Sequence, residues 1–216
     1  MASKERHVRV QRTARYHVLG DPASAKDLWI VLHGHGHLAR FFLNTFEGLE
    51  EDRCIVAPEA LNRYYLDTTY SRVGATWMTR EDREHEITDQ IGYLDELARL
   101  MRLECRNSTR LNVLGFSQGV ATLCRWAALG GTAIDRMVIW GGSMPPELEA
   151  DVLRDRWASM RIDLVHGEQD PLVKADVLER SASLLRNAGL EFHTHAFHGG
   201  HELDKLTVDR LFRDED

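Results

Sequence analysis

Short apolar runs bounded by turn residues recur along this chain. They cover residues 28–32, 54–57, 111–114, 137–140 and 162–165, and residues 191–197 form a further expected strand. Runs of this length are typical of strands that are buried on both faces, as in a parallel sheet. The pattern therefore predicts a central sheet assembled from these segments.

Helical patterns separate the apolar runs. In the clearest one, Ile87, Ile91, Leu94, Ala98 and Met101 recur at intervals of three or four residues, so they share one helix face. Further helices are expected over residues 118–129, 171–187 and 201–212. Strands that alternate with helices imply right-handed crossovers and an α/β fold with helices on both faces of the sheet.

The N-terminal segment has a different pattern. Val8 and Val10, and then Tyr16 and Val18, alternate with polar residues and no helix separates the two pairs. We therefore expect an antiparallel hairpin at one edge of the sheet. The stretch after Trp140 has room for only one short helix, so no substantial cap domain is expected. The 216 residues suit a single domain spanning 1–216.

Charge and cysteine content narrow the class of protein. A balance of 27 basic and 34 acidic residues gives a net charge of −7, which makes nucleic acid an unsuitable partner. Residues 1–10 are charged and no apolar run is long enough to span a membrane, so a cytoplasmic protein without stable membrane insertion is expected. Cys54, Cys105 and Cys124 lack C-x-x-C spacing and are expected to be reduced, mostly buried thiols. The sequence leaves open whether the protein forms a homo-oligomer.

The segment Gly115-Phe116-Ser117-Gln118-Gly119 places G-x-S-x-G between an expected strand and an expected helix. A nucleophile elbow needs this context, because the sharp turn exposes the serine hydroxyl and small flanking residues let strand and helix approach closely. The alternative interpretation is a serine that caps an ordinary helix. The context favours Ser117 as a nucleophile.

A serine nucleophile requires an acid and then a histidine later in the chain. Asp170 follows the strand at 162–165, with Glu168 as the reserve acid, although Asp170 could also be only the N-cap before Pro171. His201 follows the strand at 191–197, with His198 as the alternative. His201 is preferred because it lies where the loop meets the last helix.

These residues together predict acyl transfer. His201 would take the proton of Ser117 and return it to the leaving group, while Asp170 would hold the imidazole tautomer. The backbone N–H groups of Gln118, at the start of a helix, and of His35, in the glycine-rich loop after the strand at 28–32, are the expected oxyanion donors.

The loop of residues 33–37 allows two other interpretations. Its alternating histidines His33, His35 and His37 suggest a metal, but no Cys, Asp or Glu stands nearby at ligand spacing. Residues 34–39 also match the dinucleotide pattern G-x-G-x-x-A, with Glu59 as a ribose acid. Neither interpretation explains Ser117, so we expect no metal and no cofactor.

The order of motifs resembles the phospholipase/carboxylesterase family of α/β-hydrolases, which includes the acyl-protein thioesterases. The motifs are L-H-G-x-G at residues 32–36, A-P at 57–58, an isolated Trp77, G-F-S-Q-G at 115–119, H-G-x-x-D-x-x-V at 166–173 and G-H-E at 200–202. The resemblance covers nearly the whole chain after the N-terminal segment. It implies a triad of Ser117, Asp170 and His201, with oxyanion amides from His35 and Gln118.

Several positions depart from the family pattern. The family commonly has Leu where His35 stands and W-F-D where this chain has Trp77-Met78-Thr79. We expect Met78 and the His35 side chain to shape the acyl pocket, and Trp77 to line it or to be an ordinary buried aromatic. Three tyrosines, Tyr64, Tyr65 and Tyr70, share the loop of residues 62–76. Acyl-protein substrates are therefore not implied.

The predicted function is that of a serine carboxylesterase or thioesterase. It would cleave short- to medium-chain acyl esters or thioesters through a covalent acyl-enzyme. The alternatives are a catalytically silent binding protein of the same fold and a lysophospholipase that acts on single-chain lipids.

Overall fold

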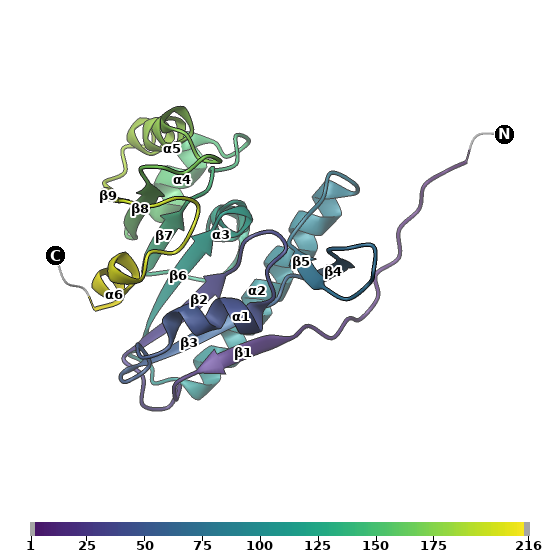
Figure 1. Ribbon diagram of the computed structural model, residues 1–216, viewed down its shortest axis with the longest axis horizontal. Coiled ribbons are helices and arrows are strands. Elements are labelled where there is room, and N and C mark those ends of the chain that lie inside the picture. The colour runs from purple at the N-terminus through teal and green to yellow at the C-terminus, as the bar shows by residue number, and fades with distance from the viewer. Residues whose placement is uncertain (1–2, 214–216) are drawn as a thin grey trace.

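A seven-stranded sheet forms the centre of the molecule in the computed structural model, which describes residues 3–213 (Figure 1). The strands, in spatial order, are β1 (Tyr16–Leu19), β3 (Arg53–Pro58), β2 (Asp27–Leu32), β6 (Arg110–Phe116), β7 (Arg136–Trp140), β8 (Arg161–Gly167) and β9 (His193–Phe197). Only β1 runs antiparallel to its neighbour in this sheet. The prediction of a mostly parallel sheet is confirmed.

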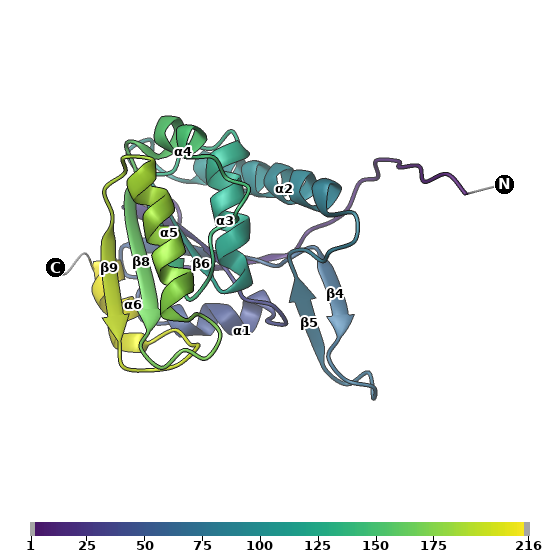
Figure 2. The ribbon, with the colours of Figure 1, turned by 90° about the horizontal axis from the view of Figure 1, so that it is seen from above.

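Helices cover both faces of the sheet (Figure 2). One face carries α2 (Arg83–Glu104), α3 (Gln118–Leu129), α4 (Ala150–Trp157) and α5 (Ala175–Asn187), and the other carries α1 (Ala39–Leu43), the short 3-10 helix Asn44–Phe46 and α6 (Lys205–Arg213). Successive side chains of a strand point to opposite faces. In β2, Leu28, Ile30 and Leu32 accordingly pack in the first core, and Trp29 and Val31 in the second.

The expected N-terminal hairpin is wrong in one of its two strands. Residues 3–15 form no strand, and Val8 and Val10 are 84% and 78% exposed. The edge strand β1 pairs with β3 instead, in a register that places Tyr16 opposite Pro58. The edge of β3 offers both backbone partners and an apolar core, whereas a hairpin with Val8 and Val10 would bury little surface.

Two helices begin later than their patterns predict. Helix α5 begins at Ala175 rather than at residue 171, and α6 begins at Lys205 rather than at residue 201. In the first case the Asp170 carboxylate accepts the backbone N–H groups of Leu172 and Val173, which holds this segment in a turn. A polar side chain that bonds nearby amides competes with helix formation in this way.

A second, two-stranded sheet lies in the segment that we expected to be a loop. Strand β4 (Asn62–Tyr65) pairs antiparallel with β5 (Val73–Thr76), and Figure 2 shows this hairpin projecting away from the main sheet. Neither of its two strands belongs to the seven-stranded sheet. The hairpin contacts the loop that follows β2 through backbone hydrogen bonds of Ala75, on β5, with Gly36 and His37.

The three cysteines match their expectation. Cys54 and Cys124 are buried, Cys105 is half-buried, and all three are free thiols. Burial raises the pKa of Cys54 and of Cys124 to about 12. These thiols are therefore protonated at neutral pH. Across residues 3–213, every helix is too short or too polar to cross a bilayer.

A buried ion network joins β7, β8 and β9 at one end of the sheet. The Asp163 carboxylate, on β8, contacts Arg136 Nε at 2.7 Å and His195 Nε2 at 2.8 Å. Burial alone would raise the pKa of Asp163, but Arg136 and His195 outweigh it and lower the pKa below its ordinary value. Asp163 is therefore ionised in the folded protein.

We expect Asp163→Asn to lower the free energy of unfolding by about 3 to 5 kcal/mol, because it removes one partner of a buried charge pair. Since the folded-state pKa is depressed, the wild-type contribution is present above the unfolded value of about 4 and is lost as the pH falls through the lower folded value. Urea unfolding at neutral and acid pH measures both effects. Asp176→Asn, which breaks an exposed pair with Arg180, is the control; equal stability of the two variants would contradict the prediction.

Candidate active site

Ser117 occupies a strained turn between β6 and α3. Its backbone angles are φ 54° and ψ −116°, outside the regions that residues with a β-carbon favour. The turn is held by a hydrogen bond from the Ser117 N–H to the Trp140 carbonyl oxygen at 2.9 Å. A β-carbon on Gly119 would lie 2.3 Å from the Leu32 carbonyl oxygen, so only glycine fits there. This local geometry is that of a nucleophile elbow.

The structure brings Ser117, His201 and Asp170 into direct contact. His201 Nε2 lies 2.8 Å from Ser117 Oγ, and His201 Nδ1 lies 2.7 Å from Asp170 Oδ2. The three residues follow β6, β8 and β9, whose carboxyl ends meet at one edge because these strands are parallel. In this way the sheet brings together His201 and Asp170, which are 31 residues apart in the sequence, and His201 and Ser117, which are 84 residues apart.

The Asp170 carboxylate is held from both sides. Its Oδ2 faces His201, while Oδ1 accepts the backbone N–H groups of Leu172 at 2.7 Å and Val173 at 3.0 Å. Burial alone would raise the pKa of Asp170, but these hydrogen bonds outweigh it and lower the pKa below its ordinary value. An ionised carboxylate accepts a hydrogen bond from the Nδ1–H group of His201, which leaves Nε2 free to accept the proton of Ser117.

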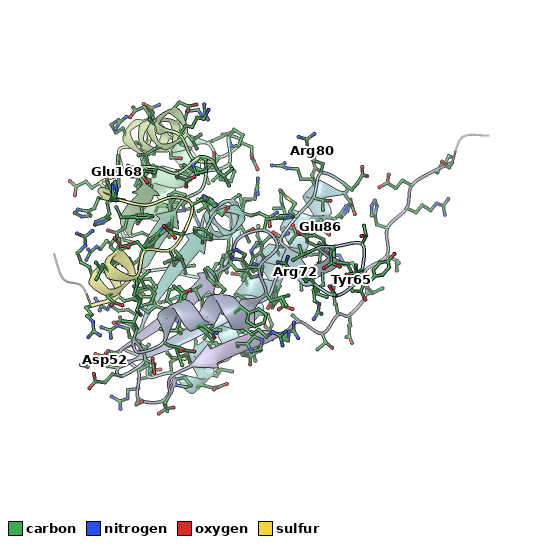
Figure 3. All side chains as sticks on the ribbon, in the orientation of Figure 1. Asp52, Tyr65, Arg72, Arg80, Glu86 and Glu168 are labelled. Atoms are coloured by element: carbon green, nitrogen blue, oxygen red, sulfur yellow. The ribbon has the colours of Figure 1, made fainter. Side chains whose placement is uncertain are left out.

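The reserve residues Glu168 and His198 lie apart from this chain of hydrogen bonds. The His198 side chain is 80% exposed, and its Nδ1 lies 3.4 Å from Glu168 Oε2. Glu168 directly follows β8 and lies on the side of the molecule where β8 and β9 end the sheet (Figure 3). The two alternatives pair with one another, and the structure brings neither into contact with Ser117.

The loop after β2 passes directly over the elbow. A β-carbon on Gly34 would lie 3.2 Å from Ser117 Cβ, so the backbone of this loop runs close against the serine. Within residues 3–213, the N–H groups of His35 and Gln118 donate no hydrogen bond to another protein group. Gln118 is the first residue of α3, where the helix dipole favours negative charge. Both amides are placed beside Ser117 by the loop and the elbow.

The two expected pocket residues differ in burial. Trp77 is fully buried, and its Nε1 donates to the His33 carbonyl oxygen at 2.8 Å. This placement corresponds to the buried aromatic that the sequence left open as an alternative. Met78 is half-buried, and its carbonyl oxygen accepts the Gln118 side-chain amide at 2.9 Å. Met78 is therefore the residue of the pair that lies partly at the surface.

His37 is a neighbour of the site that the sequence did not single out beyond the metal question. Its ring stacks on Phe116 at a centroid distance of 5.9 Å, and Phe116 in turn contacts the His201 ring at 5.0 Å. Burial lowers the pKa of His37, and the nearby His201 lowers it further. In the sequence, only the alternation of histidine and glycine in residues 33–37 pointed to His37 as a residue near the site.

The histidines of this loop are held by protein groups. His33 Nδ1 donates to the Gly34 carbonyl oxygen at 2.7 Å, and His33 Nε2 accepts the Ala60 N–H at 3.1 Å. Burial lowers the pKa of His33 to about 4, so the ring is neutral. Glu59, the residue proposed for a ribose, is buried and paired with Arg15 at 2.6 Å.

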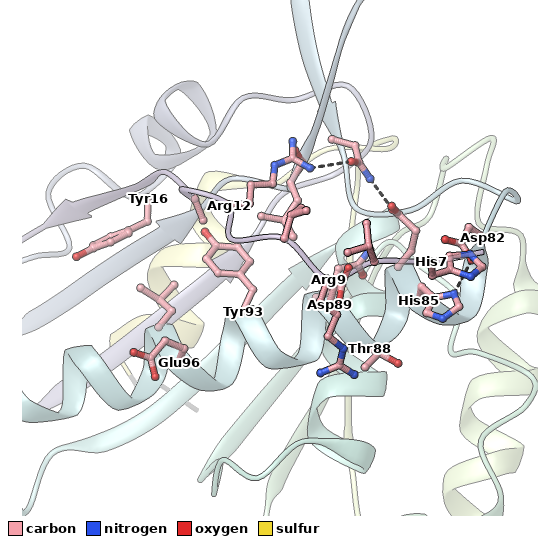
Figure 4. Close-up of a pocket in the computed structure, with 18 of the residues that line it drawn as sticks. His7, Arg9, Arg12, Tyr16, Asp82, His85, Thr88, Asp89, Tyr93 and Glu96 are labelled. Carbon is pink, nitrogen blue, oxygen red and sulfur yellow. Dashed lines mark hydrogen bonds and ion pairs between the residues drawn. The ribbon is translucent and has the colours of Figure 1, made fainter. Parts of the chain in front are cut away.

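A separate cavity of about 800 Å³ lies between the N-terminal segment and α2 (Figure 4). At one end His7, Asp82 and His85 place possible metal-ligand atoms within 4.8 Å of one another. All three side chains are exposed, and His85 Nδ1 already contacts Asp82 Oδ1 at 2.6 Å. The residues that line this cavity include none of the Ser117, His201 and Asp170 group.

The sheet order, the strand-turn-helix elbow and the flanking helices define an α/β-hydrolase fold. The chain belongs to the phospholipase/carboxylesterase family, whose model matches residues 17–212. The resemblance inferred from the motifs is thereby confirmed. The chain matches none of the curated protein sequences.

Solved structures of similar fold include esterases and a thioesterase. The esterase PE8 is 21% identical, with a TM-score of 0.70 over 94% of this chain and 98% of that one. Acyl-protein thioesterase 2 of Zea mays is 20% identical, with a TM-score of 0.71 over 93% and 97%. A carboxylesterase of Bacillus cereus is 17% identical, with a TM-score of 0.68 over 93% and 92%.

Proposed function

We propose that this protein is a serine carboxylesterase or thioesterase that cleaves short- to medium-chain acyl esters through a covalent acyl-enzyme. The observation that carries the proposal is the continuous chain of hydrogen bonds from Ser117 through His201 to Asp170. Membership of a carboxylesterase family supports the same reaction class. The proposed chemistry uses no metal and no cofactor.

The geometry supports acylation as the first half of the reaction. His201 Nε2 takes the hydroxyl proton while Ser117 Oγ attacks the carbonyl carbon of the substrate. The amides of His35 and Gln118 donate to the oxyanion that forms, and Asp170 stabilises the charged imidazole. Collapse of this intermediate breaks the bond to the alcohol or thiol, which leaves with the proton from His201.

The second half of the reaction removes the acyl group. A water molecule gives one proton to His201, and its oxygen attacks the acyl carbon held on Ser117. When the new intermediate collapses, the proton on His201 returns to Ser117 Oγ and the carboxylic acid leaves. The same three side chains therefore serve both halves, with His201 alternating as base and acid.

An open site supports small, soluble acyl substrates. The segment between β7 and β8 contains a single helix of eight residues, α4, which is too little to form a cap domain over the carboxyl edge of the sheet. The tyrosine-rich β4–β5 hairpin projects outward, with Tyr65 and Arg72 at the surface (Figure 3). A site without a cap admits a water molecule and a short acyl chain directly.

A matched panel of p-nitrophenyl esters and acyl thioesters tests the proposal. We expect the highest kcat/KM with butyryl to octanoyl chains and a lower value with palmitoyl, because a long chain gains little contact at a site without a cap. A fluorophosphonate probe should label the wild type at Ser117 and leave Ser117→Ala unlabelled. Absence of both hydrolysis and labelling in the wild type would identify a silent binding protein instead; preference for single-chain phospholipids would indicate a lysophospholipase.

A further inference from the structure

The side chains of the two proposed oxyanion residues meet at one hydroxyl group. Thr76 Oγ1 accepts the Gln118 side-chain N–H at 2.9 Å and lies 3.2 Å from His35 Nδ1. Thr76 is buried, with 5% of its surface exposed, at the end of β5. A single buried hydroxyl thus connects the residue that begins α3 to the residue in the loop after β2.

The backbone of β5 makes the same connection on the side of the loop. The Gly36 N–H donates to the Ala75 carbonyl oxygen at 2.8 Å, and the Ala75 N–H donates to the His37 carbonyl oxygen at 3.2 Å. A β-carbon on Gly74 would lie 2.6 Å from the Gly36 carbonyl oxygen, so the two backbones are in close contact. The loop that supplies the His35 amide is therefore attached to β5.

Gln118 attaches the elbow to the other end of the same segment. Its side-chain oxygen accepts the Trp77 N–H at 3.0 Å, and its side-chain nitrogen donates to the Met78 carbonyl oxygen at 2.9 Å. With the hydrogen bond to Thr76 Oγ1, both the oxygen and the nitrogen of the Gln118 side-chain amide are bonded to residues 76–78. The residues following β5 are consequently held against the first residue of α3.

A further contact immobilises the His35 ring. Tyr64 OH, on β4, lies 2.6 Å from His35 Nε2, and the two rings stack at a centroid distance of 5.3 Å. Either neutral tautomer of His35 satisfies both ring nitrogens, because hydroxyl groups donate and accept. The ring is therefore fixed between Thr76 and Tyr64, and its backbone amide is fixed with it.

We infer that Thr76 is a positioning residue, which sets the separation of the His35 and Gln118 amides through their side chains. The inference rests on the proposed function, since it assumes that these two amides stabilise the oxyanion. Thr76 is buried and contacts the side chains of His35 and Gln118, so it acts through these two residues without touching the substrate. Because an oxyanion depends on donor geometry more than a ground-state carbonyl does, a loosened pair of amides lowers kcat and leaves KM nearly unchanged.

Three variants test this role. Thr76→Val keeps the shape and removes the hydroxyl, Thr76→Ser keeps the hydroxyl, and Thr122→Val is the control. Thr122 is also buried, on α3, and its hydroxyl contacts the Gln90 side chain at 3.4 Å rather than an oxyanion residue. The control therefore loses a buried hydroxyl from the same helix that Gln118 begins.

We expect Thr76→Val to lower kcat by about 10-fold to 100-fold, a typical effect of displacing a catalytic group. Its affinity for an alkyl boronic acid, which forms a tetrahedral adduct with the serine, should fall by a similar factor. KM should stay within about twofold of the wild type, since uniform binding is unchanged. Thr76→Ser should restore most of the kcat, and Thr122→Val should keep the wild-type kcat.

The outcomes separate this inference from the proposed function. If Ser117→Ala is inactive while Thr76→Val has the wild-type kcat and boronic acid affinity, the positioning role is overturned and the proposed function stands. If Ser117→Ala retains hydrolysis, the proposed function fails. Should Thr76→Val not fold, Tyr64→Phe removes the outer contact of His35; a lower kcat with unchanged KM is expected, and a wild-type kcat would overturn the inference.

Discussion

Replacing Ser117 with alanine is expected to lower kcat for ester hydrolysis by about 10⁶-fold, the scale seen when a nucleophilic serine is removed from such a triad. The methyl group cannot form the acyl-enzyme, so only binding and the oxyanion amides would still assist attack by water. His201→Ala is expected to show a loss of similar size, because the Ser117 hydroxyl then has no base. Steady-state hydrolysis of a p-nitrophenyl ester measures both effects.

The double variant distinguishes a working unit from independent residues. Ser117→Ala combined with His201→Ala should be about as slow as either single variant, since the two side chains act together. Ser183→Ala, on α5, is a matched control with wild-type rates, because its hydroxyl contacts Glu179. Losses that multiply in the double variant, or a single variant with the wild-type rate, would contradict the proposed mechanism.

Asp170→Asn is expected to lower kcat by about 10³-fold to 10⁴-fold. The side-chain oxygen that accepts the amides of Leu172 and Val173 has to remain an oxygen, so the new NH₂ group would face His201 Nδ1. That group donates, which forces Nδ1 to accept and moves the ring proton to Nε2. His201 could then no longer accept the proton of Ser117. Single-turnover kinetics with a p-nitrophenyl ester measures the loss of acylation.

Glu168→Gln is the matched control for the acid. Glu168 lies two residues from Asp170 but contacts the exposed His198, so this variant should keep the wild-type kcat. The result would be reversed if Glu168 were the acid of the triad. A full rate in Asp170→Asn together with a slow Glu168→Gln variant would therefore reassign this role.

The core strands and the elbow were accessible from local patterns. Continuous apolar runs predicted β2, β3, β6, β7 and β8, and the bounds of α3 agree with the pattern over residues 118–129. Both signals are local, because a strand buried on two faces is apolar throughout and a helix begins where the elbow ends. Asp170 and His201 could be chosen because each follows a strand in the expected order.

Features that depend on competing partners were not accessible. Val8 and Val10 alternate like a strand, but the edge of β3 pairs with β1 instead. Residues 171–174 read as the first turn of a helix, but the Asp170 side chain holds their amides in a turn. In each case a contact from elsewhere in the fold or from a side chain outweighs local propensity.

By itself, the sequence determined the order of the buried strands β2, β3, β6, β7 and β8, the position of the serine turn and the candidates for acid and base, because each depends on residues adjacent in the chain. Only the tertiary structure decided between His201 and His198 as the neighbour of Ser117, and between Asp170 and Glu168 as the neighbour of His201. It alone placed Thr76 between His35 and Gln118. These choices depend on distances between residues far apart in sequence, which are set by how the strands align in the sheet and by how β5 contacts the loop after β2.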